Sequence, residues 1–132
     1  MITLDTSAIL ALLNRQDRDH AGVRGAADAN GGPFVVPAAT LGELAYFIEA
    51  RMSLIVLETF LTDLEAGRYA LDAGEGDFAR VRYLVRRYAD LPLGFVDAAV
   101  IACAERRGGM VLTLDRRQFD VVARERTITV LP

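Results

Sequence analysis

The sequence of 132 residues contains no lysine and no tryptophan, and it has a single cysteine, Cys103, and a single histidine, His20. Without lysine, the chain cannot use a P-loop lysine, a Schiff base or a lysine general base. One cysteine and one histidine exclude an intrachain disulfide and a zinc site built from several Cys and His ligands. Carboxylates and hydroxyls are the groups that remain for chemistry.

The sequence also lacks a hydrophobic run of the about 18 residues that a membrane-spanning helix needs, although 52% of its residues are hydrophobic. Its first residues carry an early acid, Asp5, and no basic stretch, so we predict no signal peptide. We therefore expect a cytoplasmic protein that does not bind membranes. The surplus of apolar residues suggests a homodimer face, a groove for a partner, or both.

The length fits one domain, which we expect to span residues 1–132. Apolar segments bounded by turn residues predict short strands, and helical periodicity predicts helices between most of them. The predicted strands are 2–4, 34–36, 68–71, 110–114 and 127–131, and the predicted helices are 5–13, 21–29, 39–51, 53–65, 76–88 and 95–107. Strands that alternate with helices predict an α/β fold with a mostly parallel sheet.

Four acidic residues occupy unusual positions. Asp5 and Asp115 each follow a Thr-Leu pair at the end of an apolar strand. Ligands of open parallel sheets bind beyond the carboxyl ends of the strands, so we expect these two acids to meet there. Asp97 and Glu43 lie on predicted helices with apolar residues around them, and an unpartnered buried carboxylate costs several kcal/mol or takes up a proton.

Each acid also has a purely structural interpretation. Asp5 fits a helix N-cap, Asp115 a turn, Asp97 a helix-dipole position, and Glu43 a capping box with Thr40. Brought together, however, the four would repel one another unless a cation lay among them. Oxygen ligands without His or Cys favour Mg²⁺ or Mn²⁺ over zinc, and such ions suit phosphoryl chemistry.

The order of these motifs resembles that of PIN-domain ribonucleases, and within them the VapC toxins of bacterial VapBC toxin–antitoxin pairs. The motifs are Asp5-Thr6-Ser7, Gly42-Glu43-Leu44, Val96-Asp97-Ala98 and Thr113-Leu114-Asp115-Arg116-Arg117-Gln118-Phe119. The resemblance covers essentially the whole chain. It implies a three-layer α/β/α PIN-like domain with a central, mostly parallel five-stranded sheet, in which the first and fourth strands are adjacent.

The resemblance also implies a function. Asp5, Glu43, Asp97 and Asp115 would hold Mg²⁺ or Mn²⁺ in an endoribonuclease that hydrolyses RNA, with tRNA or rRNA as the expected substrate. The protein would be a toxin that inhibits translation and is silenced by a cognate VapB-like antitoxin. Thr6, Ser7 and Thr113 are candidates for orienting the acids or waters, although each is equally well explained as a cap or strand residue. Gln118 departs from the family pattern, because many relatives have an acid or a histidine there.

Arginine is concentrated in the second half of this chain of net charge −3: residues 1–78 have 5 Arg and 12 acidic residues, and residues 79–132 have 10 and 6. Phosphate groups of RNA require such basic residues. Arg116 and Arg117, beside the predicted metal site, are the preferred RNA contacts. Arg80, Arg82, Arg86 and Arg87 are further candidates, with an ordinary solvated helix face as the alternative.

Other functions remain open at this stage. A housekeeping RNA-processing nuclease without an antitoxin would have the same acids, and so would a catalytically silent binding module. A haloacid-dehalogenase-like phosphatase is disfavoured, because Ser7 stands where a second Asp is needed and lysine is absent. The apolar residues 52–57, with Phe60 and Leu61, predict that the helices of residues 39–64 contribute to a homodimer or antitoxin interface.

Overall fold

Five short strands form one parallel sheet in the computed structural model, which describes all residues 1–132. The strands are β1 (Ile2–Leu4), β2 (Phe34–Pro37), β3 (Tyr69–Asp72), β4 (Met110–Leu112) and β5 (Thr129–Leu131). Their order is β3-β2-β1-β4-β5, and every pairing is parallel. The prediction that the first and fourth strands are adjacent is confirmed, so the residues that follow them meet at one edge.

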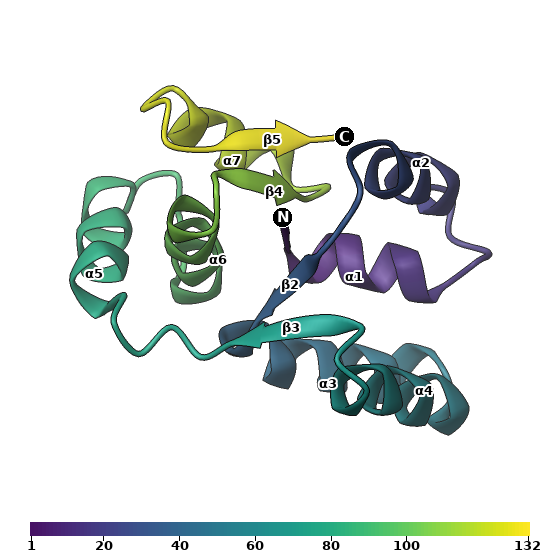
Figure 1. The fold of residues 1–132 in the computed structure, drawn as a ribbon. Helices are drawn as coiled ribbons and strands as arrows, with labels where there is room; N and C mark the ends of the chain where they lie inside the picture. Colours follow the sequence, from purple (N-terminus) through teal and green to yellow (C-terminus); the bar gives the residue numbers. More distant parts are fainter.

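Helices cover both faces of the sheet, as expected for three layers (Figure 1). One face carries α1 (Thr6–Leu13), α2 (His20–Asn30), α3 (Leu41–Arg51) and α4 (Leu54–Glu65), with a 3₁₀ turn at Ala38–Thr40 before α3. The other face carries α5 (Phe78–Arg87), α6 (Phe95–Arg106) and α7 (Arg116–Ala123). The sequence analysis predicted all of these helices except α7. None of the seven is long and apolar enough to cross a membrane.

The alternation of side chains along β1 explains the two layers. Ile2 and Leu4 point to the same side and are buried in the cluster formed with α1 to α4. Thr3 points to the opposite side, where its hydroxyl lies 3.9 Å from Sγ of Cys103 in α6. The sheet is buried on both faces. On the second face, α6 packs over the end of β1, and its first turn lies near the carboxyl edge of the sheet.

Helices α3 and α4 bury less apolar surface than their composition suggests. Ser53 caps α4 by accepting a hydrogen bond from the Val56 backbone N–H at 3.3 Å. Phe60 is only 2% exposed, so it packs into the core and does not belong to an outer face, which corrects the prediction for this residue. Ile55 is 73% exposed and Leu61 is 53% exposed. Ile55 and Leu61 are therefore the exposed apolar residues of α4 that the predicted homodimer or antitoxin interface would use.

Ion pairs between distant segments fix the helices of the second face. Arg106 at the end of α6 contacts Asp72 and Asp77, both buried, with N···O distances of 2.7 and 2.6 Å. Arg80 pairs with Glu105 at 2.7 Å and with Glu125 at 2.9 Å. The prediction that Arg80 is a free phosphate contact is therefore wrong, because its guanidinium is already engaged by two carboxylates.

Candidate active site

Asp5 lies at the carboxyl end of β1 and is 5% exposed. It occupies the N-cap position of α1, but its side chain makes no capping bond. Instead, Oδ2 accepts hydrogen bonds from the hydroxyl of Thr113 at 2.7 Å and from the hydroxyl of Ser7 at 3.1 Å. Asp5 therefore has the expected N-cap position but does not cap the helix with its side chain, and the carboxylate is held toward β4.

The same two hydroxyls connect Asp5 to the loop that leads to Asp115. The hydroxyl of Ser7 accepts from the Leu114 backbone N–H at 2.9 Å, and that of Thr113 accepts from the Asp115 backbone N–H at 2.9 Å. Thr6 behaves differently, because its buried hydroxyl has no hydrogen-bond partner and contacts none of the acids. Ser7 and Thr113 thus position the acids, whereas the Thr6 hydroxyl orients none of them.

Asp97 lies in the first turn of α6 and is half-buried. Burial raises the pKa of its carboxyl to about 6, and the negative charges of Asp5, Asp115 and Glu43 act in the same direction. The side chains of all four acids are therefore within electrostatic reach of one another. Asp97 is thus subject to the charges of the other three carboxylates, and it also occupies the helix-dipole position that was the alternative.

Glu43 is the most open of the four acids. It lies in the first turn of α3 and is exposed, as is Tyr46 one turn later at 69%. The expectation that apolar neighbours enclose Glu43 is therefore wrong. The proposed capping box is absent as well, because the Thr40 hydroxyl accepts no backbone N–H of the first turn of α3 and instead donates to the Pro37 carbonyl at 2.8 Å.

Asp5 and Asp115 also have raised pKa values. Burial raises the pKa of Asp5, and the hydrogen bonds from Thr113 and Ser7 oppose it. Burial raises the pKa of Asp115, and the charge of Arg117 opposes it. In the structure, no three His, Cys, Asp or Glu side chains are arranged as a metal-binding group. Asp5, Asp115 and Glu43 act on Asp97 through their charges, but the four side chains do not form a preassembled metal-binding group.

The two arginines that follow Asp115 differ in their contacts. Arg116 pairs with Asp120 at 3.1 Å and donates to the Pro132 carbonyl at 2.8 Å. Arg117 is exposed, forms no ion pair in the structure and acts on Asp115 only through its charge. Of these two RNA-contact candidates, only Arg117 therefore has a free guanidinium beside the acids.

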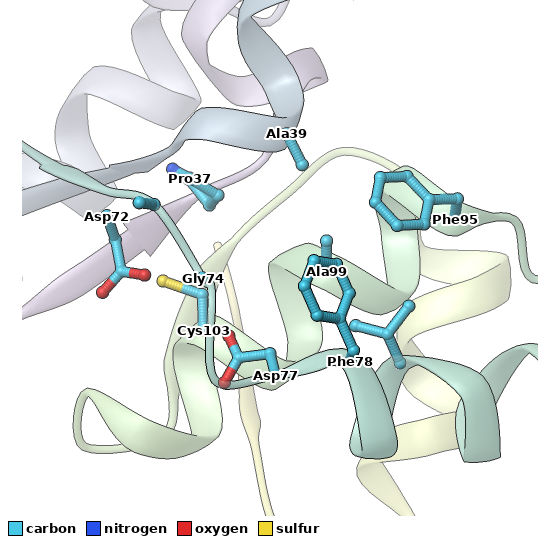
Figure 2. Close-up of a pocket in the computed structure, with 11 residues that line it drawn as sticks. Pro37, Ala39, Asp72, Gly74, Asp77, Phe78, Phe95, Ala99 and Cys103 are labelled. Carbon is cyan, nitrogen blue, oxygen red and sulfur yellow. The ribbon is translucent and has the colours of Figure 1, made fainter.

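A small, partly open apolar pocket is separate from the four acids. Figure 2 shows the pocket between the start of α5, α6 and the end of β2, with a cavity of about 40 Å³. Phe78, Phe95 and Ala99 line it, and none of the four acids does. Its two carboxylates, Asp72 and Asp77, are bound by Arg106. The pocket is therefore not the reaction centre.

A parallel α/β/α sandwich with acids gathered at the carboxyl edge of its sheet defines a PIN-like domain. The family model described as "PIN domain" matches residues 2–125. The chain is also 32% identical over 121 residues to Ribonuclease VapC26 of Mycobacterium tuberculosis strain H37Rv, covering 90% of each chain. The chain belongs to the PIN-domain family, and it is of the VapC type.

Solved structures agree on the fold. The crystal structure of Mycobacterium tuberculosis VapC20, described as a sarcin-ricin loop cleaving toxin, matches with a TM-score of 0.76 and 18% identity, over 92% of this chain and 95% of that one. FitAcB from Neisseria gonorrhoeae matches with a TM-score of 0.63 and 20% identity, over 100% of this chain and 97% of that one. At these identities the two likenesses show the fold alone.

Proposed function

We propose that this protein is an endoribonuclease that depends on Mg²⁺ or Mn²⁺ and acts as the toxin of a type II toxin–antitoxin system. Its single PIN domain, residues 1–132, would cleave tRNA or rRNA in the cytoplasm and thereby inhibit translation. The observation that carries this proposal is that Asp5 and the loop to Asp115 are brought together by the pairing of β1 with β4 and by the Thr113 hydrogen bond. The pKa of Asp97, raised by burial and by the charges of the other three acids, agrees with it. The relative named Ribonuclease VapC26 supports a nuclease, and the fold neighbour VapC20 is itself described as a sarcin-ricin loop cleaving toxin.

The residues at the acidic edge fit a hard divalent cation. Asp5, Glu43, Asp97 and Asp115 would hold it, because carboxylate oxygens are the ligands that Mg²⁺ and Mn²⁺ prefer. The hydrogen bonds from Thr113 and Ser7 both go to Oδ2 of Asp5, so Oδ1 of this carboxylate accepts no side-chain hydrogen bond and is available to an ion. When bound, such an ion lowers the pKa of water and stabilises negative charge on phosphate oxygens.

The chain's own residues have separate tasks in this proposal. Thr113 and Ser7 keep Asp5 directed toward β4 through their hydrogen bonds to Oδ2. Arg117 supplies a free positive charge next to Asp115 for a phosphate of the substrate. Arg82, Arg86 and Arg87 are exposed on α5 and form no ion pairs in the structure, so they remain candidates for more distant phosphates.

A cleavage assay tests the function directly. We expect the parent to cut RNA with Mg²⁺ or Mn²⁺, EDTA to stop it, and Asp5→Asn and Asp97→Asn to reduce the rate by at least about 100-fold, as loss of electrostatic stabilisation does. Asp90→Asn, an exposed acid in the turn before α6, is the matched control and should keep full activity. Activity that survives both substitutions would mean a contaminant or a wrong site. Cleavage without toxicity on overexpression would favour a housekeeping nuclease.

Exposed apolar residues support the proposed partners. On α3 and α4, Tyr46, Leu54 and Ile55 are 69%, 69% and 73% exposed, which favours this surface for a VapB-like antitoxin. A second set, Phe78 and Phe95 at 67% and 55%, lies on α5 and α6 and was not predicted from the sequence. Two separate apolar surfaces allow a homodimer and an antitoxin complex to form on different faces of the protein.

A further inference from the structure

Gln118 is the one motif residue that departs from the family pattern, and it contacts a candidate metal ligand. It lies in the first turn of α7, three residues after Asp115, and its carboxamide faces both oxygens of the Asp115 carboxylate. Only an N–H group can donate to these oxygens, so we assign the amide nitrogen, rather than the amide oxygen, to the position that faces them; the distances that follow apply to this orientation. The nitrogen lies 3.2 Å from Oδ2 and also donates to Oδ1.

No other side chain in the structure donates to the Asp115 carboxylate. The backbone of Asp115 is held separately, because its N–H donates to the Thr113 hydroxyl at 2.9 Å. Arg117 influences the carboxyl through its charge but forms no ion pair with it. The direction of the Asp115 side chain is therefore set mainly by the amide of Gln118.

We propose that Gln118 is a positioning residue for Asp115, whose amide fixes the direction in which this carboxylate meets a divalent cation. The inference rests on the proposed function. Each carboxylate oxygen has two lone pairs, so an oxygen that accepts from the amide can still bind an ion. An amide donor also adds no negative charge to an edge where Asp5, Asp97 and Asp115 already lie together, whereas an acid at position 118 would.

Calorimetric titration with Mn²⁺ tests this inference without reference to catalysis. Gln118→Met keeps the length of the side chain but removes the donor, and we expect it to weaken Mn²⁺ binding by about 10-fold, in the range known for groups that orient a ligand. Gln118→His, which restores an N–H donor, should recover part of the affinity. Gln16→Met is the matched control, because Gln16 is exposed in the loop after α1, and it should bind Mn²⁺ like the parent.

The variant Asp115→Asn separates failure of this inference from failure of the proposed site. If Asp115→Asn abolishes Mn²⁺ binding while Gln118→Met stays within about twofold of the parent, the positioning role of Gln118 is wrong and the site stands. If Asp115→Asn also binds Mn²⁺ normally, the carboxylate site itself is wrong. Should Gln118→Met fail to fold, Gln118→Ser removes the same contact with a small polar side chain and gives the same comparison.

Discussion

The hydroxyl of Thr113 donates a hydrogen bond of 2.7 Å to Oδ2 of Asp5, although the two residues are 108 positions apart in the sequence. The register of the sheet causes this contact, because Leu4 pairs with Leu112 and the next residues of β1 and β4 therefore meet. The bond places the first acid of the site against the loop that carries the last one. The acidic edge is thus a direct product of pairing between β1 and β4.

Removal of this bond should destabilise the protein. Thr113→Val leaves the buried Asp5 carboxyl without its shortest hydrogen bond, and we expect the free energy of unfolding in EDTA to fall by about 1–2 kcal/mol. Thr113→Ser keeps the hydroxyl and should lose less. Urea denaturation measures both, with the exposed Thr127→Val as control. A Thr113→Val protein as stable as the parent would show that the bond contributes nothing.

Asp97 should make stability depend on pH. Its pKa is about 6 in the folded protein against 3.8 for a free carboxyl, so the folded state binds this proton more tightly than the unfolded state. The ionised Asp97 therefore lowers the free energy of unfolding by its full amount above pH 6, and this loss disappears as the pH falls from 6 to 3.8. In EDTA, Asp97→Asn should therefore be more stable than the parent at pH 8, by about 1–3 kcal/mol after solvent screening, and equal to it near pH 4. A stability difference that does not change with pH would contradict this assignment.

The two neighbouring arginines should differ in RNA binding. Arg117→Ala removes a free guanidinium, and we expect weaker binding and a fall of about 0.7 in the slope of log affinity against log salt, the value for one phosphate of single-stranded RNA. Arg116→Ala should change neither quantity, because its guanidinium is engaged by Asp120 and Pro132. Fluorescence anisotropy with labelled RNA, in the Asp97→Asn background to prevent cleavage, measures both. Equal effects of the two substitutions would show that the difference in pairing is irrelevant to RNA.

The apolar surface of α3 and α4 should bind the antitoxin. Ile55 is 73% exposed, so Ile55→Asp should leave the fold intact and abolish co-purification with the product of a neighbouring antitoxin gene. A charge buried in an apolar interface has no partner and costs several kcal/mol. Phe78→Asp, at 67% exposure on α5, is the control for the other surface. If the Ile55→Asp protein still co-purifies with the antitoxin, the predicted location of the interface on α3 and α4 is wrong.

The sequence predicted the five strands and most helices because the apolar segments are clearly separated by turn residues, whereas the adjacency of the first and fourth strands was implied only by the family resemblance. It did not predict α7, whose first residues are charged and polar. The only core residues of this helix are Phe119 and Val122, three positions apart, which is a weak helical signal among charged neighbours. The helical structure of α7 depends on its packing against β5 and α6, which a local sequence pattern does not report.

The candidate site was predictable to different degrees at different residues. The apolar sequence around Asp97 correctly indicated a carboxyl with a raised pKa, because its neighbours are on the same helix. The exposure of Glu43 was not predictable, since it depends on whether another element covers α3. The pairing of Arg80 with Glu105 and Glu125 joins residues 25 and 45 positions apart, and no local pattern reports such tertiary contacts.

The most direct test of the proposed site is anomalous diffraction from crystals of the protein soaked in Mn²⁺. The proposal predicts a manganese peak at the carboxyl edge of the sheet, with oxygens of Asp5, Asp97 and Asp115 around it and Glu43 turned toward it. Crystals of Asp97→Asn treated in the same way should lose or weaken that peak. A saturating soak that leaves this edge without manganese, or that binds the ion only elsewhere, would contradict the account.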